Sequence, residues 1–348
     1  MENNWRSKLM RFNAPEVYID LGTANTLVYL SNKGLIVNEP SYLTYRKGWY
    51  GAQSPLAVGT EAKRMLGRTP GNLEVVRPLS EGVIADFHAT KSMMWHWLKP
   101  IFNKRFIRKP ELIISLPCKV TDFERKTIAD LGTSMGSPRV YLLDEPMAAA
   151  VGEGMPIETS EGSLVVDIGG GTTEIALIAL NGIVYSKALR IGGYNFDRRI
   201  IDYIRNKFNF VIGELTAERI KIEAGSAVPQ AASSHINIIG TDLNNGVPKA
   251  LAVSAHDIHL AIEPEVRAIV SAIKETLSAI PVEFSDMILT KGMLLTGGGA
   301  LLKDLAQRIE METNVQTAVS PEPLLSVVKG GIETLKNRSL RERVTISA

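Results

Sequence analysis

Two stretches of the chain share one pattern of apolar strands and polar turns. An apolar segment ending in Ile19-Asp20-Leu21 runs into Gly22-Thr23-Ala24-Asn25, a second apolar run at 27–30 and a turn at 32–34. Val166-Asp167-Ile168 runs into Gly169-Gly170-Gly171-Thr172, an apolar run at 175–178 and an Asn181-Gly182 turn. Short apolar runs separated by Gly and Asn turns are typical of β-hairpins. The pattern predicts two similar units, half a chain apart, in two domains that face each other.

Strand and helix patterns alternate through the rest of the chain. We expect strands at 111–116, 140–143 and 293–295, and a strand pair within 236–254 that turns at 244–246. Helical patterns cover an amphipathic segment capped by Thr121 and the segments 146–151, 196–208, 214–224 and 263–280. Such alternation favours a layered α/β fold.

Composition narrows the functional classes. A chain of 348 residues with 45% hydrophobic and 22% charged residues fits a globular protein of two domains. The formal charge of +2 gives no electrostatic footprint for nucleic acid, so we expect no nucleic-acid partner. Cys118 is the single cysteine, which suits a reducing cytosol. No apolar run reaches the roughly 18–20 residues of a spanning helix, and no secretory signal is visible.

The first residues have an amphipathic helical pattern. Met1, Trp5, Leu9 and Phe12 share one face, with Arg6 and Arg11 on the remainder. A short helix of this kind can lie in a membrane interface, although it can also pack as an ordinary end cap.

The two Asp-led glycine turns are the strongest candidates for chemistry. Backbone N–H groups in such turns can approach an anion closely because no Cβ intervenes. Asp20 and Asp167 end the preceding strands, where they can hold hydrated Mg²⁺ against phosphates. One such turn would be an ordinary turn, whereas two form a clamp on a phosphate chain from opposite sides.

Two further motifs extend this site. Thr296 is followed by Gly297-Gly298-Gly299-Ala300 and the start of a helix, which brings backbone close to a ligand. Glu145 precedes Pro146 at a strand-to-helix junction and suits the orientation of an attacking water. Alternatively, Glu145 is an ordinary acidic residue favoured by the helix dipole.

Together these strings resemble the rod-shape MreB family of the actin superfamily, collinearly from about residue 16 to about residue 335. The strings that carry the resemblance are 20–26, 38–41, 66–72, 82–87, 145–150, 167–174, 217–221 and 295–302. The resemblance implies an actin-like two-domain ATPase fold, with duplicated ribonuclease H-like domains and ATP in the cleft between them. It divides the chain into an amphipathic segment at 1–15, domain I at 16–145 with 321–348 returning to it, and domain II at 146–320.

The family also implies roles at matching positions. Glu145 would position the hydrolytic water with help from Thr172, and Asp20 and Asp167 would lie near Mg²⁺. Nucleotide contacts would come from three groups of residues: Thr23, Ala24 and Asn25; Gly170, Gly171 and Thr172; and Gly297, Gly298, Gly299 and Ala300. Glu218, Arg219, Ile220 and Lys221 would flank ribose and adenine.

The resemblance further implies where the protein works and with what. Members polymerise, so we expect the chain itself as a partner in paired protofilaments, and membrane proteins of the cell-wall elongation machinery beside it. They bind the inner face of the cell membrane through an amphipathic helix or a hydrophobic loop. Trp5, Leu9 and Phe12 are candidates for the first, and Phe106-Ile107, within the basic segment 103–109, for the second. The expected location is the cytoplasm, peripheral to the membrane.

One departure and three rival functions stay open. The family commonly has Asp where this chain has Tyr194, which puts the hydrolysis rate or nucleotide preference in doubt. A small-molecule kinase would need a general base beside an acceptor hydroxyl. A chaperone-like ATPase would need a further peptide-binding domain. A polymer subunit that binds ATP but barely hydrolyses it would keep the same motifs.

The C-terminal Arg338–Arg343 cluster is interpreted as a solvated face.

Overall fold

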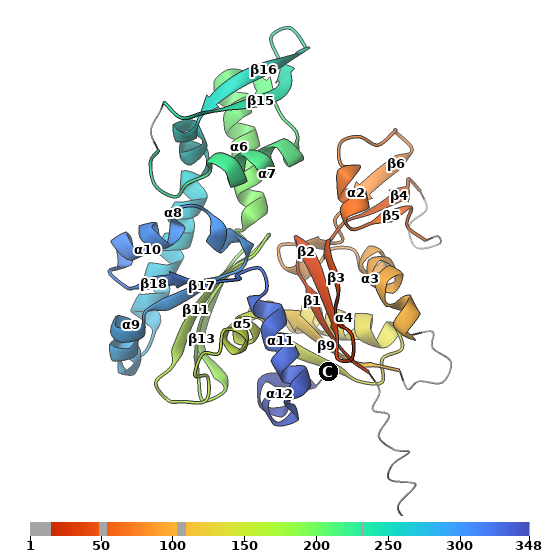
Figure 1. Cartoon of the computed structure of the whole chain (residues 1–348), viewed down its shortest axis with the longest axis vertical. Helices are drawn as coiled ribbons and strands as arrows, with labels where there is room; N and C mark the ends of the chain where they lie inside the picture. The colour runs from red at the N-terminus through yellow and green to blue at the C-terminus, as the bar shows by residue number, and fades with distance from the viewer. Residues whose placement is uncertain (1–14, 49–53, 103–108, 231–232, 348) are drawn as a thin grey trace, which may run out of the picture.

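Two large β-sheets, with helices between them and on their outer faces, form the body of the protein (Figure 1). The computed structural model describes residues 15–48, 54–102, 109–230 and 233–347. The amphipathic N-terminal face and the Phe106-Ile107 pair lie outside the described residues. Within those residues, no helix is both long and apolar enough to cross a bilayer.

The first sheet has six strands in the order β19-β10-β9-β1-β2-β3. Its strands are β1 (Glu16–Leu21), β2 (Asn25–Leu30), β3 (Gly34–Pro40), β9 (Glu111–Leu116), β10 (Val140–Asp144) and β19 (Thr345–Ser347). Helices α3 (Phe87–Phe102) and α4 (Asp122–Ser134) share a hydrophobic core with one face of this sheet. Thr121 begins α4 with a capping box, in which Glu124 N–H donates to Thr121 Oγ1, as the sequence predicts.

The second sheet has five strands in the order β13-β12-β11-β17-β18. They are β11 (Ser163–Ile168), β12 (Thr173–Ala179), β13 (Gly182–Leu189), β17 (Met293–Thr296) and β18 (Thr317–Val319). Its outer core is shared with α6 (Gly193–Phe208), α7 (Glu214–Ala224), α8 (Ala255–Ala279), α9 (Ser285–Lys291) and α10 (Leu305–Thr313). Both predicted hairpins are confirmed, since β1-β2-β3 and β11-β12-β13 repeat one antiparallel arrangement.

Helices α5 (Glu145–Gly152) and α11 (Ser326–Lys336) lie between the two sheets. A separate hydrophobic cluster joins them to Tyr18 and Ile113 of the first sheet and to Val165 and Ile178 of the second. Beyond α11, helix α12 (Arg338–Val344) leads into β19, which pairs with β10. The chain therefore returns to the first sheet after the second is complete, although the exact domain boundaries stay a prediction.

Each large sheet and its helices are here called a body, the first body around the six-stranded sheet and the second around the five-stranded sheet. Each body carries a small three-stranded sheet at its upper end in Figure 1. One, here called the β4–β6 lobe, consists of β4 (Leu43–Arg46), β5 (Ala57–Val58), α2 (Thr60–Arg64) and β6 (Leu73–Val76). The other contains β14 (Phe210–Val211), β15 (His235–Asp242) and β16 (Val247–Ser254). The short hairpin of β7 (Leu79–Ser80) and β8 (Val83–Ile84) follows the β4–β6 lobe.

Two sequence predictions need correction. The helix expected to begin at Glu263 begins at Ala255, because Ser254 Oγ accepts the N–H of Asp257 as an N-cap and the helix continues through Pro264. The Arg338–Arg343 cluster is not uniformly solvated. Arg341 is buried, lies 2.5 Å from Glu16 Oε1 and stacks over Tyr141.

Glycines allow α5 and α11 to cross at close range. A Cβ on Gly330 would lie 1.8 Å from the carbonyl oxygen of Ala148, and one on Gly152 would lie 2.0 Å from that of Ser326. The Gly330→Ala substitution must push the helices apart. We expect it to lower the free energy of unfolding by about 1–3 kcal/mol, the usual cost of overpacking.

Urea denaturation of Gly330→Ala and Gly71→Ala measures this effect. Gly71 is a matched control because a Cβ there meets no atom of the described residues within 4 Å. Equal free energies of unfolding for the two variants would show that the crossing tolerates a methyl group.

Candidate functional site

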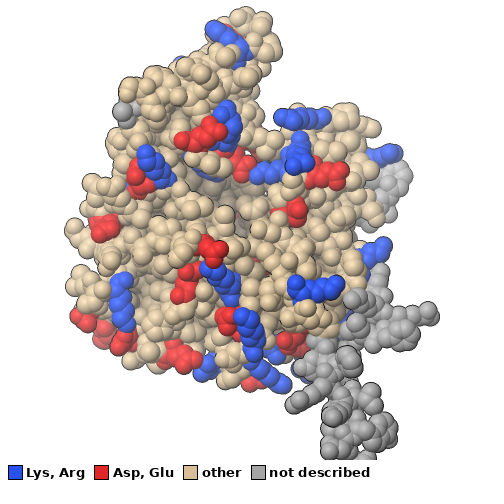
Figure 2. All heavy atoms as spheres, viewed as in Figure 1, with Lys and Arg blue, Asp and Glu red and all other residues tan. Residues whose placement is uncertain are grey.

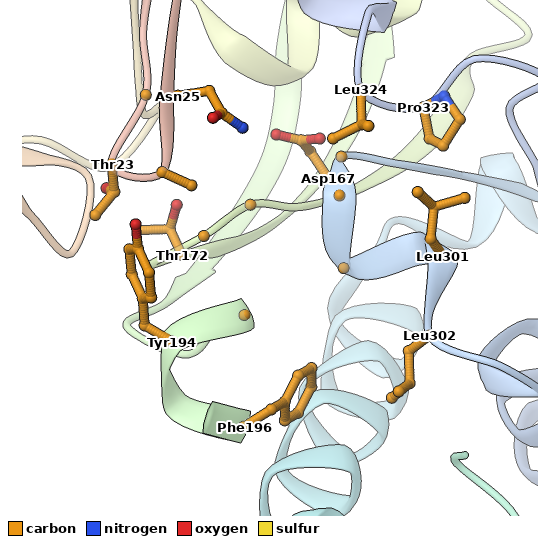
Figure 3. A pocket seen from close by; sticks show the side chains of 18 of the residues that line it. Thr23, Asn25, Asp167, Thr172, Tyr194, Phe196, Leu301, Leu302, Pro323 and Leu324 are labelled. Carbon is orange, nitrogen blue, oxygen red and sulfur yellow. The ribbon is translucent and has the colours of Figure 1, made fainter. Parts of the chain in front are cut away.

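The turns of the two repeated hairpins meet at one cavity of about 470 Å³ between the sheets. The turn after β1 contributes Gly22, Thr23 and Ala24 to its lining, and the turn after β11 contributes Gly169, Gly170 and Thr172. Figure 3 shows Thr23 and Asn25 on one side of the cavity, with Thr172 close by and Asp167 further along. The convergence of residues 20–26 and 167–173 predicted from the sequence is therefore confirmed.

Hydrogen bonds fix the first turn. Ser41 Oγ donates to the carbonyl oxygen of Gly22 at 2.7 Å, and the Ser41 N–H donates to the carbonyl of Ala24. On the opposite side, the N–H of Gly82 donates to Thr23 Oγ1 at 2.9 Å. Contacts within the protein itself thus define the shape of the turn.

The second turn is built in the same way and touches the first. The N–H of Gly169 donates to the carbonyl of Thr172, while the first residues of α6, Gly193 and Tyr194, donate to the carbonyls of Gly169 and Gly170. A Cβ on Gly170 would lie 2.5 Å from the Cβ of Ala24. Glycine is required at this position for the two turns to approach so closely.

A third glycine loop joins the second turn through Asp167. Thr296 Oγ1 donates to Asp167 Oδ1 at 2.8 Å. Gly297 has a φ of +77°, and a Cβ there would lie 2.7 Å from the same oxygen. The loop continues as the short helix η2 (Gly298–Leu301), and Gly297, Gly298 and Gly299 all line the cavity.

Half-buried and buried carboxylates gather at one part of the cavity. Asp20, Glu145 and Asp167 line the cavity, and Glu174 lies behind them with no exposed surface. Burial, with the nearby charge of Asp167, raises the pKa of Asp20 to about 7. Burial also raises the pKa of Glu145 well above its usual value, reinforced by Glu174 and Asp20. Carboxylate oxygens are the donors that a hard cation such as Mg²⁺ takes, so the chemistry of these residues suits the ion. Among the described residues no three such side chains are arranged to hold a metal directly, which leaves contact through water.

The same cluster predicts how stability depends on pH. Burial raises the pKa of Glu174 to about 8, and that of Asp20 to about 7, whereas both groups titrate near 4 when unfolded. The folded chain therefore binds more protons than the unfolded chain between about pH 4 and pH 8, and its stability falls as pH rises through that window.

We expect the free energy of unfolding of the nucleotide-free protein to be at least about 1 kcal/mol lower at pH 8.5 than at pH 5.5. Urea titrations at the two pH values measure it. Glu174→Gln, which removes one titrating group, should flatten the dependence. If the difference in the free energy of unfolding between the two pH values is the same in Glu174→Gln as in wild type, groups other than Glu174 cause the pH dependence.

Another part of the cavity lining combines charged and apolar side chains. Glu218 and Lys221 line it from α7, and Lys221 Nζ lies 2.9 Å from Asp197 Oδ1 and 3.0 Å from the carbonyl oxygen of Gly193. Glu218 is also held across the cleft by Lys63 Nζ, at 2.7 Å. The apolar wall consists of Phe196, Ile222, Leu301, Leu302, Pro323, Leu324 and Val327. Such a surface suits the flat face of a nucleotide base.

Most, but not all, of the predicted site residues line this cavity. Thr23, Ala24, Asn25, Gly170, Thr172, Glu218, Lys221, Gly297, Gly298 and Gly299 do so, together with Asp20, Glu145 and Asp167. Gly171, Arg219, Ile220 and Ala300 do not. Ile220 and Ala300 are buried in the core of the second sheet, and Arg219 pairs with Glu223 at 2.9 Å.

Sequence reasoning missed several residues of the lining. Leu301, Leu302 and Lys303 directly follow the third glycine loop in sequence, which indicates that they lie near the ligand. Ile222 is four residues from Glu218 on the same face of α7, which indicates the same for Ile222. Phe196 and Asp197 belong to the first turn of α6. Pro323, Leu324 and Val327 arrive from a distant connection and carry no sequence signal of their own.

Comparisons with known proteins agree with this geometry. The model of the family described as MreB/Mbl protein matches residues 14–343. The cell shape-determining protein MreB of Escherichia coli K12 is 44% identical over 323 residues, which cover 92% of this chain and 93% of that protein. The cell shape-determining protein Mbl of Bacillus subtilis 168 is 41% identical over 317 residues, which cover 91% and 94%.

Solved structures share the fold. The crystal structure of MreB5 of Spiroplasma citri bound to ADP has a TM-score of 0.88 at 32% identity, covering 95% of this chain and 98% of that one. Its counterpart bound to AMPPNP has a TM-score of 0.85 at the same identity and coverage. The MamK double helical filament, at 20% identity, has a TM-score of 0.77 over 92% of this chain and 99% of that one, which supports the actin-like fold alone. On its sequence and its actin-like α/β fold, the chain belongs to the MreB/Mbl family of cell shape-determining proteins.

Proposed function

We propose that the chain is an ATP-dependent, filament-forming bacterial actin that binds the inner membrane surface and directs cell shape by organising cell-wall synthesis. The observation that carries the proposal is the convergence of two Asp-led glycine turns and a third glycine loop on one cavity lined by carboxylates. The relatives' names and the nucleotides in the MreB5 structures support the same assignment.

Each group of residues in the cavity has a separate role in the proposed hydrolysis of ATP. The turns at Thr23–Asn25 and Gly170–Thr172 hold the phosphates, and Gly297–Gly299 close over the α-phosphate and ribose. Mg²⁺, when bound, neutralises phosphate charge, and Asp20 and Asp167 would hold it through water. Glu145 orients the attacking water with Thr172 beside it. Catalysis rests on alignment and charge neutralisation, without a covalent intermediate.

Assembly and location complete the proposal. ATP-bound subunits join into paired protofilaments, and hydrolysis is coupled to polymer turnover. The polymer lies in the cytoplasm against anionic lipid, beside membrane proteins of the elongation machinery. The membrane contacts assigned to Trp5, Leu9, Phe12, Phe106 and Ile107 stay predictions from sequence.

Sedimentation and electron microscopy of the full chain test the assembly. With ATP and Mg²⁺ we expect pelletable filaments and slow phosphate release that depends on filament formation. A coupled assay against a panel of sugars separates the kinase alternative. ADP release that requires an acceptor sugar, without filaments, would overturn the proposal.

The membrane assignment needs its own experiment. Wild type should co-sediment with vesicles that contain phosphatidylglycerol, and the double variant Trp5→Glu, Phe106→Glu should assemble but remain unbound. Undiminished pelleting of the double variant with vesicles would reject these two contact sites.

A further inference from the structure

Tyr194 occupies an unusual place at the edge of the nucleotide cavity. It is the second residue of α6, its N–H donates to the carbonyl of Gly170 at 2.9 Å, and its side chain lines the cavity. Figure 3 shows the ring extending from the start of α6 on the same side as Thr23 and Thr172. The backbone of Tyr194 is therefore bonded to the second phosphate turn, and its ring makes a separate contact with another part of the molecule.

That contact lies across the cleft. The guanidinium of Arg77, which follows β6, lies 4.5 Å from the centre of the Tyr194 ring. The same guanidinium lies 5.5 Å from the centre of the ring of Tyr42, a buried residue that packs with Ala57 and Ala62 in the core of the β4–β6 lobe. Arg77 also forms an ion pair with Glu214, the first residue of α7. Tyr194 thus reaches from the second body into the β4–β6 lobe of the first.

Other cross-cleft contacts place the same two surfaces face to face. Lys63 of α2 pairs with Glu218, and Arg190 pairs with Glu81 at 3.0 Å. Figure 2 shows basic and acidic side chains on both upper parts of the molecule, around the central hollow. These are partly exposed ion pairs that contribute little individually. The Arg77–Tyr194 stack is different in kind, because the face of an aromatic ring attracts the guanidinium.

Three short connections link the stack to the phosphate turns. The carbonyls of Gly169 and Gly170 accept from Gly193 and Tyr194, so a shift of the second turn moves the start of α6. Lys221, which lines the cavity, donates to the carbonyl of Gly193. On the lobe side, Arg77 is a few residues from Gly82, whose N–H donates to Thr23 of the first turn.

We propose that Tyr194 is a positioning residue that couples occupancy of the phosphate turns to closure of the β4–β6 lobe through its stack with Arg77. With nucleotide in place the turns hold α6 where the ring meets Arg77, and the closed lobe slows nucleotide release. This inference rests on the proposed function, because it requires a nucleotide in the cavity.

Stopped-flow release of a fluorescent ATP analogue from the full chain tests the coupling. Tyr194→Ala should release the analogue about five to ten times faster than wild type, the effect expected for one lost cation–π contact. Tyr194→Phe, which keeps the ring, should stay within about twofold of wild type. The single-turnover rate of hydrolysis should change less than the release rate, because Tyr194 acts on closure.

Arg77→Gln supplies the second arm of the experiment and changes a partly exposed residue, so the fold should survive. It should accelerate release at least as much as Tyr194→Ala, because it also removes the ion pair with Glu214. The double variant should release no faster than Arg77→Gln alone, because that variant has already lost the stack. Tyr203→Ala is the matched control. It lies on the same helix and also meets a cation, Lys207 at 5.5 Å, but is not part of the cavity lining.

Three results would overturn the coupling: release from Tyr194→Ala at the wild-type rate, a double variant whose acceleration is the product of the two single effects, or equal acceleration in Tyr203→Ala. Binding of the analogue by wild type is measured first. If wild type binds none, the proposed function fails instead, which keeps the two failures distinct.

Discussion

Glu145→Gln is expected to slow ATP hydrolysis by about 100- to 1000-fold while ATP binding stays near the wild-type value. Glu145 begins α5 at the end of β10, and its carboxylate lines the cavity beside Asp20 and Asp167. An amide of the same shape can fill the position but cannot accept a proton from water. The substitution also removes one negative charge from the cavity, which lowers the repulsion of a phosphate, so affinity should not fall.

Single-turnover phosphate release and calorimetric binding of ATP distinguish these effects. Glu161→Gln is a suitable control, because Glu161 is exposed and pairs with Lys291 away from the cavity. Filaments should persist in Glu145→Gln. Equal phosphate release in wild type and Glu145→Gln would remove Glu145 from its assigned role.

Gly170→Val is expected to weaken ATP binding by about ten- to a hundredfold, the equivalent of a typical overpacking cost of 1–3 kcal/mol. A Cβ on Gly170 already lies 2.5 Å from the Cβ of Ala24, so a branched side chain must separate the two phosphate turns. Once separated, they cannot both donate to one phosphate chain.

Calorimetry with ATP and excess Mg²⁺ measures this loss, and thermal unfolding shows whether the variant is folded. Gly71→Ala serves again as the control, since its Cβ contacts none of the residues that the structure describes. A folded Gly170→Val that binds ATP as tightly as wild type would mean that the two turns need not approach each other.

Local pattern was sufficient to predict the elements that build the site. The paired hairpins, the cap at Thr121 and the start of α5 depend on residues that are neighbours in sequence, so turn and cap chemistry determines them. The start of α8 was predicted wrongly because Pro264 is a usual mark of a first turn, yet the helix runs through it from a serine cap.

Contacts between distant segments could not be predicted in the same way. Arg341 is buried because α12 brings it to Glu16 and Tyr141. The charged residues beside it in sequence give no indication of this contact. The Arg77–Tyr194 stack likewise joins residues from opposite bodies, and only the assembled cleft brings them together. Leu324 and Val327 reach the cavity because α11 returns between the sheets.

The decisive measurement is a crystal or cryo-electron microscopy structure of this chain with AMPPNP and Mg²⁺. The account predicts one nucleotide whose β- and γ-phosphates accept hydrogen bonds from both the 22–25 and 169–172 turns, with the metal ion near Asp20 and Asp167. A nucleotide bound elsewhere, or phosphates that contact only one of the two turns, would contradict it.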